Sequence, residues 1–212
     1  MEAKAYANEI LRRLKRKYRS EMETSLRHSG EWELLVATML SAQAQDKQVN
    51  KITARLFRKY GSIGDFAELR PQQLYPYIKS IGLYRAKGKN IIKTARALRD
   101  KFDLKVPDTL EELTTLSGVG RKTANVILAN AFGINEGIAI DTHCITVANR
   151  LGLARTNNPY KIEKRLMKLI DKRDWGNLTH LFIALGRDVC TARAKHCDRC
   201  VLRDICPSST AR

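Results

Sequence analysis

The stretch LSGVGRKTANVILANAFG, residues 116–133, decides the fold of this chain. Its second half has apolar residues at the spacing i, i+3, i+4 and i+7, which predicts one face of a helix: Ala124, Ile127, Leu128 and Ala131. Just before them, Gly118 and Gly120 permit a tight turn. The turn and the start of the next helix both present free backbone N–H groups, so the stretch predicts a hairpin that can bind an anion. The alternative is an ordinary corner between helices, in which the glycines only permit the turn.

Helical periodicity extends over the rest of the chain. Apolar residues recur at helical spacing within residues 6–14, 34–40, 49–57, 74–81, 91–102, 110–116, 147–151, 162–170 and 178–185. No segment alternates with period two, so we expect an all-α protein. Asp46 and Asp141 are expected to cap helices and Pro71 to open one, while Asp108 and Glu111 have the spacing of a capping box.

The charge balance is strongly basic. The 212 residues include 39 Lys and Arg against 22 Asp and Glu, a formal net charge of +17. A hydrophobic fraction of 43% indicates a folded globular protein rather than a disordered chain. Because the basic residues are spread over the whole sequence, we expect a positive face for a polyanion, either nucleic acid or an acidic membrane surface. A plain solvated surface is the alternative.

No segment is predicted to enter a membrane or to direct secretion. No uncharged apolar run reaches the roughly 18 residues that a membrane-spanning helix needs. Residues 1–20 are charged throughout and lack the apolar centre of a secretory signal. We therefore expect a cytoplasmic protein that is not inserted in a membrane.

Four of the five cysteines are clustered near the C-terminus. Cys190, Cys197, Cys200 and Cys206 have the spacing C-x6-C-x2-C-x5-C. Intracellular thiols are kept reduced, which argues against disulfides, and four unconnected surface cysteines would not be expected to cluster. A metal site is the better explanation, and four thiolates suit either zinc or an iron–sulfur cluster. The spacing leaves both metals open, with the longer intervals weakly favouring a cluster.

Two residues near the glycine turn are candidates for chemistry. Lys122 lies in the first turn of the expected helix, where the helix dipole disfavours a cation. It is either a solvated surface lysine or a nucleophile whose neutral amine attacks a carbon electrophile. Asp141 lies nineteen residues later and is either a plain helix cap or a partner of that amine.

Several motifs together resemble the endonuclease III family, the bifunctional DNA glycosylases of the helix-hairpin-helix base-excision-repair superfamily. They are the stretch quoted above, IDTHC at residues 140–144, LSAQAQDKQVN at 40–50, IGLYRAKGKNI at 81–91, and the cysteine spacing. The resemblance extends from about residue 25 to Cys206, with every motif in the family order. It implies a two-lobed all-α fold with an iron–sulfur loop at its C-terminal end.

The resemblance also implies domain boundaries and catalytic residues. Residues 24–134 would form a six-helix domain with the hairpin. Residues 1–23 and 135–212 would form a second helical domain, ending in a four-cysteine loop at 187–207. Lys122 would be the nucleophile and Asp141 the catalytic aspartate. The four clustered cysteines would ligate one 4Fe-4S cluster, with zinc as the alternative cofactor.

The DNA-contacting residues implied by the resemblance fall into three groups. Gln43 and Leu83 would fill or wedge the base stack where a damaged base leaves. The hairpin and the residue after it would hold phosphate, and two basic residues between the first two cysteines would touch DNA. The phosphate-holding residues are Gly118, Val119, Gly120 and Arg121, and the two basic residues are Arg193 and Lys195.

The implied function is the removal of oxidised or ring-saturated pyrimidines from double-stranded DNA, with strand cleavage 3′ to the abasic site by β-elimination. The enzyme would act as a monomer, in the cytoplasm on the nucleoid. Two alternatives are a monofunctional mismatch glycosylase of the same superfamily and a non-catalytic DNA-binding module. The first typically lacks a lysine at the position of Lys122, and the joint presence of Lys122 and Asp141 speaks against the second.

Overall fold

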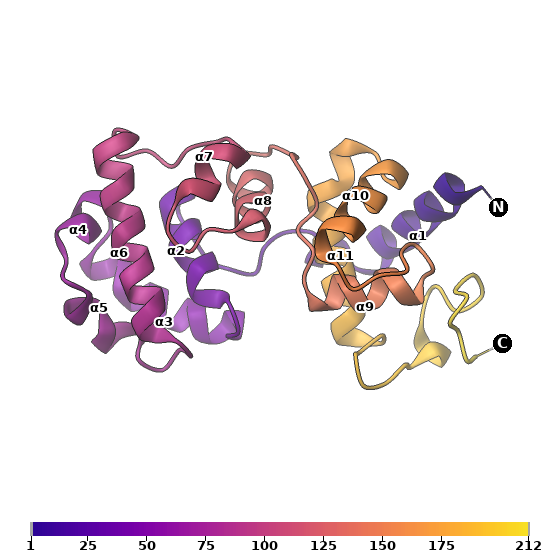
Figure 1. Ribbon diagram of the computed structural model, residues 1–212. Coiled ribbons are helices and arrows are strands. Elements are labelled where there is room, and N and C mark those ends of the chain that lie inside the picture. Colours follow the sequence, from indigo (N-terminus) through magenta and orange to yellow (C-terminus); the bar gives the residue numbers. More distant parts are fainter. Residues whose placement is uncertain (1, 212) are drawn as a thin grey trace. The chain divides into compact units, whose positions relative to one another are not determined.

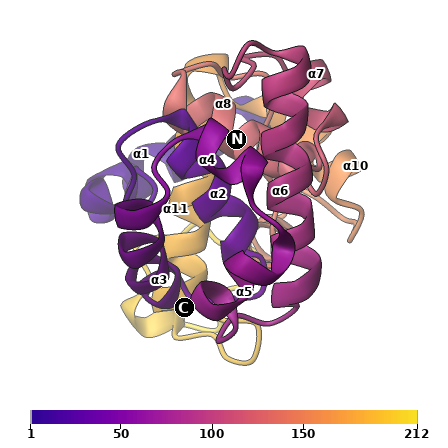
Figure 2. The same ribbon diagram turned by 90° about the vertical axis from the view of Figure 1, so that its left-hand side faces the viewer.

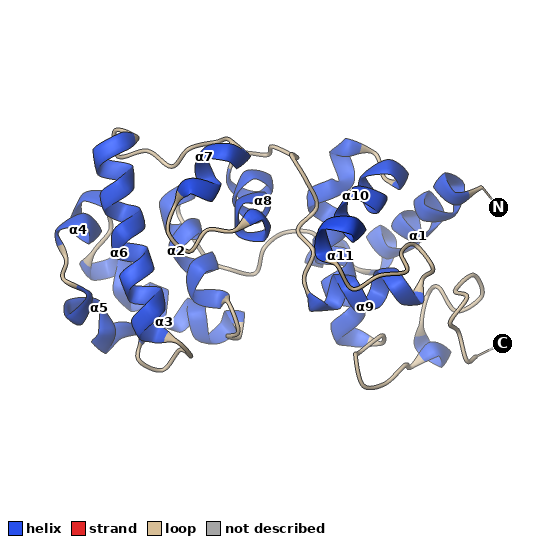
Figure 3. Cartoon of the chain, viewed as in Figure 1, coloured by secondary structure: helices blue, strands red, loops and turns tan. Residues whose placement is uncertain are grey.

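The computed structural model describes residues 2–211, and every regular element in that range is a helix (Figure 3). Within residues 2–211, an isolated antiparallel backbone bridge pairs Cys190 with Lys195. The all-α expectation is therefore confirmed. The chain divides into two compact units, which are described separately (Figure 1): unit 1 comprises Met1–Thr24 and Asn135–Arg212, and unit 2 comprises Ser25–Ile134. None of the helices within residues 2–211 combines the length and apolar character that a bilayer crossing requires.

Unit 2 is built around one apolar helix. Its helices are α2 (Glu31–Ser41), α3 (Asp46–Lys59), α4 (Ile63–Glu68), α5 (Pro71–Ile78), α6 (Tyr84–Lys101), α7 (Leu110–Thr115) and α8 (Arg121–Ala131). Seven of the eleven residues of α2 are buried, so this helix is apolar on nearly every side. It lies between α3 and α6 and also packs against α8 (Figure 2). The buried position of α2 fixes where its C-terminal loop leaves the core.

Unit 1 joins the two ends of the chain. It contains α1 (Ala3–Lys17), α9 (Thr142–Arg150), α10 (Pro159–Leu169) and α11 (Trp175–Asp188), with three short 3₁₀ turns. The core lies on α11, where Leu181 and Phe182 are completely buried. A Cβ on Gly186 would lie 2.9 Å from Nδ1 of His143, so the glycine permits α9 to pack closely on α11. That contact holds the start of α9, which carries Asp141.

Two expected helix caps are wrong. Asp46 is already the first helical residue of α3, and the N-cap is Gln45, whose backbone is extended. The cap of α7 is Thr109 rather than Asp108, and its hydroxyl accepts a hydrogen bond from the backbone N–H of Glu112 at 3.2 Å. A cap is the residue at which the backbone leaves helical dihedral angles, and neighbouring polar residues compete for that position.

Helix α4 was not expected from the sequence. It has only six residues, too few for a periodic apolar pattern to show. A reciprocal capping box between Ser62 and Asp65 starts it, and Phe66 within the helix is completely buried.

Candidate functional site

The glycine hairpin lies on the surface of unit 2 and is fastened to α6. Gly118 has φ +80°, in the left-handed region, and a Cβ there would lie 2.8 Å from Nδ2 of Asn90 on α6. The hydroxyl of Thr94, also on α6, donates to the carbonyl of Ser117 at 3.0 Å. Gly120 has no atom within 4 Å of its Cβ position. The first glycine is therefore required by the turn and its close approach to α6, whereas the second leaves an open backbone surface.

The hairpin ends directly at the start of α8. Val119 is 4% exposed and anchors the turn in the core. Gly120 is the N-cap of α8 and offers no side chain to the first-turn N–H groups. Arg121 is half-buried, and Lys122, the second residue of the helix, is exposed. The free backbone N–H groups at the start of α8 and the exposed amine of Lys122 thus lie within three residues of one another in the sequence. This arrangement suits an anionic ligand that also carries an electrophilic carbon.

Asp141 is held firmly in unit 1. Its Oδ1 accepts a hydrogen bond from the backbone N–H of Cys144 at 2.8 Å, so the expected cap of α9 is confirmed. The segment before it, residues 138–140, is apolar and buried. The buried hydroxyl of Thr179 on α11 donates to the carbonyl of Ala139 at 3.0 Å. Both sides of Asp141 are therefore tied to the core, while its own side chain is only half-buried.

Gln43 and Leu83 share an unusual backbone conformation. Their φ angles are +58° and +59°, which is uncommon for residues with a side chain. Both side chains are exposed, and Leu83 is 67% exposed, more than the other large apolar side chains on the surface of residues 2–211. A left-handed residue other than glycine costs roughly 1–2 kcal/mol. Such strain occurs preferentially at functional sites, and it is also present at Asp103 and Leu104 in the turn after α6.

The four C-terminal cysteines line one pocket in unit 1. Cys190, Cys197, Cys200 and Cys206 share it with three basic side chains, those of Arg150, Lys195 and Arg203. Burial raises the pKa of the Cys200 and Cys206 thiols. Within residues 2–211, no group of three or more His, Cys, Asp or Glu side chains is arranged to hold a metal ion.

Arg150 was missed by the sequence analysis. From the end of α9, its Nη1 donates to Sγ of Cys190 at 3.4 Å and to the carbonyl of Thr191 at 2.7 Å. The guanidinium therefore places positive charge beside a candidate ligand sulfur. No sequence signal indicates this, because Arg150 lies forty residues before Cys190 in a helix with an ordinary amphipathic pattern.

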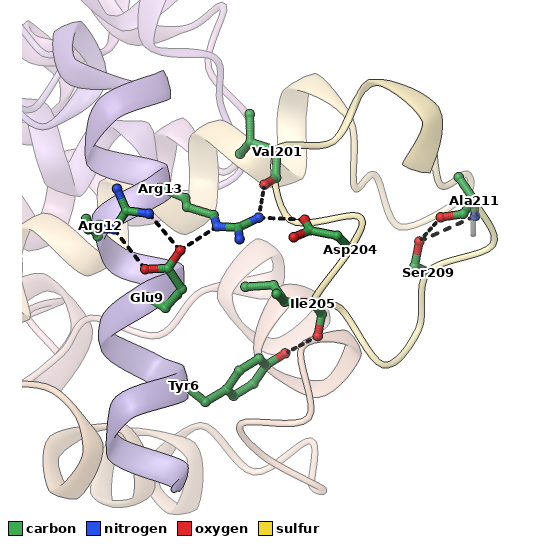
Figure 4. A network of polar contacts seen from close by, with 9 residues as sticks. All are labelled: Tyr6, Glu9, Arg12, Arg13, Val201, Asp204, Ile205, Ser209 and Ala211. Carbon is green, nitrogen blue, oxygen red and sulfur yellow. Dashed lines mark hydrogen bonds and ion pairs between the residues drawn. The ribbon is translucent and has the colours of Figure 1, made fainter. Parts of the chain in front are cut away.

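Helix α1 fastens the far end of the cysteine loop, residues 187–207 (Figure 4). The hydroxyl of Tyr6 is shared between the carbonyl of Leu151 at 3.0 Å and that of Ile205 at 3.3 Å. Nη1 of Arg13 donates to the carbonyl of Val201 and to Oδ1 of Asp204 at 3.1 and 2.5 Å. The three acceptors in the loop, Val201, Asp204 and Ile205, each lie within two residues of a clustered cysteine. Burial raises the pKa of Tyr6 to about 12, so its hydroxyl remains a donor at neutral pH.

The cysteine loop is also anchored by an apolar side chain. Leu202 is completely buried and belongs to the core of unit 1. Arg193 and Lys195 are both exposed, but Nζ of Lys195 donates to the carbonyl of Ser208 at 2.9 Å. Lys195 therefore supports the loop's own backbone, while Arg193 presents its charge to solvent.

The candidate residues are divided between the two units. Gln43, Leu83, the hairpin and Lys122 belong to unit 2. Asp141, the four cysteines and the two basic residues of the cysteine loop belong to unit 1.

Comparisons with known proteins agree with the motifs. Residues 36–172 match the model of the HhH-GPD superfamily of base excision DNA repair proteins. Endonuclease III of Synechocystis sp. is 45% identical over 208 residues, covering 98% of this chain and 94% of that protein. Endonuclease III of Escherichia coli is 42% identical over 203 residues, covering 96% and 95%.

Solved structures give the same result. A trapped covalent intermediate of endonuclease III with DNA has a TM-score of 0.92 at 40% identity, covering 98% of this chain and 97% of that chain. A thermostable thymine-DNA glycosylase has a TM-score of 0.77 at 21% identity over 97% of this chain and 95% of that one, which shows a common fold. The resemblance drawn from the sequence is confirmed. The chain belongs to the HhH-GPD superfamily of base excision DNA repair proteins and, within it, to the endonuclease III family.

Proposed function

We propose that this protein is a DNA glycosylase with abasic-site lyase activity, which removes oxidised or ring-saturated pyrimidines from double-stranded DNA and then cleaves the strand. The observation that carries the proposal is the exposed Lys122 in the first turn of α8, two residues after the exposed Gly120 of the hairpin. A phosphate held by the hairpin's N–H groups would bring the neighbouring sugar within reach of the amine.

The lesion must leave the base stack before its sugar can react. Extruding a nucleotide costs a few kcal/mol, and this cost is lower for a damaged base. Exposed side chains that replace the missing base offset part of the cost. Gln43 and Leu83 are proposed for this role because each projects from a strained, surface-exposed turn of unit 2.

The chemical steps follow from a primary amine. Nζ of Lys122 forms a bond to C1′ of the sugar while the glycosidic bond breaks and the base leaves with the electron pair. Asp141 takes up the lysine proton or stabilises positive charge that develops on the sugar. Opening of the sugar ring gives an imine between Nζ and C1′.

The imine then drives strand cleavage. It withdraws electrons from C2′, so a proton is lost there and the C3′–O bond breaks, which cuts the strand on the 3′ side. A hydroxyl or carboxylate nucleophile gives no such electron sink, which is why the lyase step requires a lysine. Water returns the free amine of Lys122 at the end of the cycle.

The four clustered cysteines would hold a 4Fe-4S cluster. Four thiols line one pocket, and the six- and five-residue intervals between the ligands weakly favour a cubane over a single zinc ion. The bound cluster would supply a rigid centre whose binding energy shapes the loop. Arg150 would offset thiolate charge, and Arg193 would contact DNA phosphate.

The remaining assignments follow from this role. The two compact units would be the two domains of the enzyme, with the hairpin in residues 24–134 and the cysteine loop in the other domain. The enzyme would act as a monomer in the cytoplasm, on the nucleoid.

Borohydride trapping tests the proposal. The protein is mixed with duplex DNA that carries a ring-saturated pyrimidine, and borohydride is added to reduce the imine to a stable amine. We expect a covalent protein–DNA adduct with the wild type and none with Lys122→Ala. Base release without an adduct would indicate the monofunctional class, and an undiminished adduct with Lys122→Ala would show that another residue is the nucleophile.

A further inference from the structure

Unit 2 contains a buried lysine that the reaction does not use. Lys87 lies in α6, four residues after Leu83, and only 8% of its surface is exposed. Burial lowers the pKa of this lysine, and a buried ammonium group is costly unless it is hydrogen-bonded. Lys87 therefore occupies this position at a cost in stability, which points to a specific contact.

The contact is with the loop that carries Gln43. Nζ of Lys87 donates to the carbonyls of Leu40 and Ala42 at 2.9 and 2.5 Å. These residues are near the C-terminal end of α2, where the last carbonyls have no partner in the helix and the helix dipole favours a cation. The carbonyl of Ala42 directly precedes the left-handed Gln43, so the ammonium holds the backbone at the point where the strained turn begins.

The same lysine is joined to the second strained turn through its own backbone. Leu83 is the N-cap of α6, and its carbonyl accepts the N–H of Lys87 at 3.0 Å. A second link runs in parallel, because Nε2 of Gln48 on α3 donates to the carbonyl of Ser80 at 2.7 Å. The first bridge thus connects the turn of Gln43 with the turn of Leu83, forty residues away, and the second joins the first turn of α3 to the segment just before Leu83.

We infer that Lys87 is a positioning residue that locks Gln43 and Leu83 into one preordered pair, ready to replace an extruded base. This inference rests on the proposed function, since it assigns the pair to the base stack. Without Lys87 the two turns would have to be ordered during base extrusion, and that entropic cost would slow the step that depends on both of them.

The test begins with a measurement that involves no DNA. Backbone hydrogen exchange is compared in wild type, Lys87→Met and Lys89→Met, where the control removes an exposed lysine from the same helix. Methionine keeps the unbranched stem of Lys87 and removes its donors. We expect faster exchange at residues 42–45 and 80–84 in Lys87→Met alone. Unchanged exchange there would overturn the inference.

The second measurement is the single-turnover cleavage rate on duplex DNA with a ring-saturated pyrimidine. We expect Lys87→Met to be slower by about 10- to 100-fold and Lys89→Met to match the wild type. In a Gln43→Ala background the effect of Lys87→Met should shrink to about twofold, because its target is already lost. An undiminished effect in that background would show that Lys87 supports the fold generally, and it would overturn the inference.

Two further controls separate the possible failures. If Lys87→Met does not fold, as judged by thermal unfolding, Gln48→Ala removes the second bridge from a half-buried side chain, and faster exchange at residues 80–84 is expected. Unchanged exchange in that variant would count against the linked pair. If the wild type does not cleave the duplex, the proposed function fails, whereas the exchange data still decide whether Lys87 orders the two turns.

Discussion

Gly118 and Gly120 differ in what the structure requires of them, although one valine separates them. Gly118 is left-handed and lies against Asn90, whereas Gly120 has a φ of −91° and open space at its Cβ position. The sequence alone makes the two glycines look equivalent. Gly118 is therefore needed for the fold of the hairpin, whereas Gly120 is needed for its proposed contact with phosphate.

Alanine at Gly118 should therefore mainly lower the stability of the fold, whereas alanine at Gly120 should mainly weaken DNA binding. Gly118→Ala should lower the free energy of unfolding by about 1–2 kcal/mol, because the left-handed backbone and the contact with Asn90 both penalise a Cβ. Gly120→Ala should lower it by less, about 0.5–1 kcal/mol, because alanine is a poorer N-cap than glycine although its Cβ would meet no other atom. Its methyl group should instead obstruct phosphate and weaken DNA binding. Urea unfolding and fluorescence anisotropy measure the two quantities, and equal destabilisation by both variants would contradict this assignment.

Asp141 has a structural role and a proposed chemical role, and two substitutions separate them. Asparagine also caps helices well, so Asp141→Asn should preserve the unfolding free energy, whereas Asp141→Ala should lower it by about 1 kcal/mol. Both variants lose the carboxylate, and both should reduce the single-turnover rate by about 10²- to 10⁴-fold. Full activity in Asp141→Asn would limit Asp141 to its capping role.

At the scale of elements, long helices are predicted better than their ends. The apolar patterns of α1, α6 and α11 are long enough to identify each helix from its periodicity. Short α4 was missed, and the caps Gln45 and Thr109 were assigned one residue away. Periodicity is averaged over several turns, but a helix end depends on the dihedral angles of single residues, which their neighbours in space also set.

The contact between α1 and the cysteine loop gives a prediction for the proposed cluster. Arg13 reaches the carbonyl of Val201 and the carboxylate of Asp204, whereas the neighbouring Arg12 pairs with Glu9 on its own helix (Figure 4). Arg13→Met should loosen the loop and speed the release of iron to a chelator, and Arg12→Met should leave the rate unchanged. The loss of visible absorbance with time measures both. Equal rates in the two variants would show that α1 does not protect the cluster.

At the scale of the whole molecule, the net charge of +17 predicts salt-sensitive DNA binding. Each phosphate that is neutralised adds about −0.9 to the slope of log affinity against log salt concentration. Arg193→Ala should make this slope shallower by about one, because Arg193 is exposed on the cysteine loop. Lys17→Ala removes an exposed charge from α1 and should leave the slope unchanged. Anisotropy titrations at several salt concentrations test this, and equal changes in slope would place both residues among the DNA contacts or exclude both.

The sequence by itself determined the all-α class, the family and the identity of the chemical groups. Those conclusions depend on residue type and local spacing, such as a lysine two residues after a glycine hairpin or four cysteines within one short segment. Both are present before the chain folds. The cap at Asp141 is local in the same sense, because its carboxylate reaches a backbone N–H only three residues away.

Only the tertiary structure decided what holds those groups in place. The bonds from Lys87 to the loop of Gln43, from Arg150 to Cys190, and from Arg13 to Asp204 join residues at least forty positions apart. A side chain of this kind has no local signature, because its partner is a carbonyl or sulfur that folding brings near. The left-handed turns at Gln43 and Leu83 are hidden for the same reason, since neither residue type favours that conformation and only the surrounding contacts impose it.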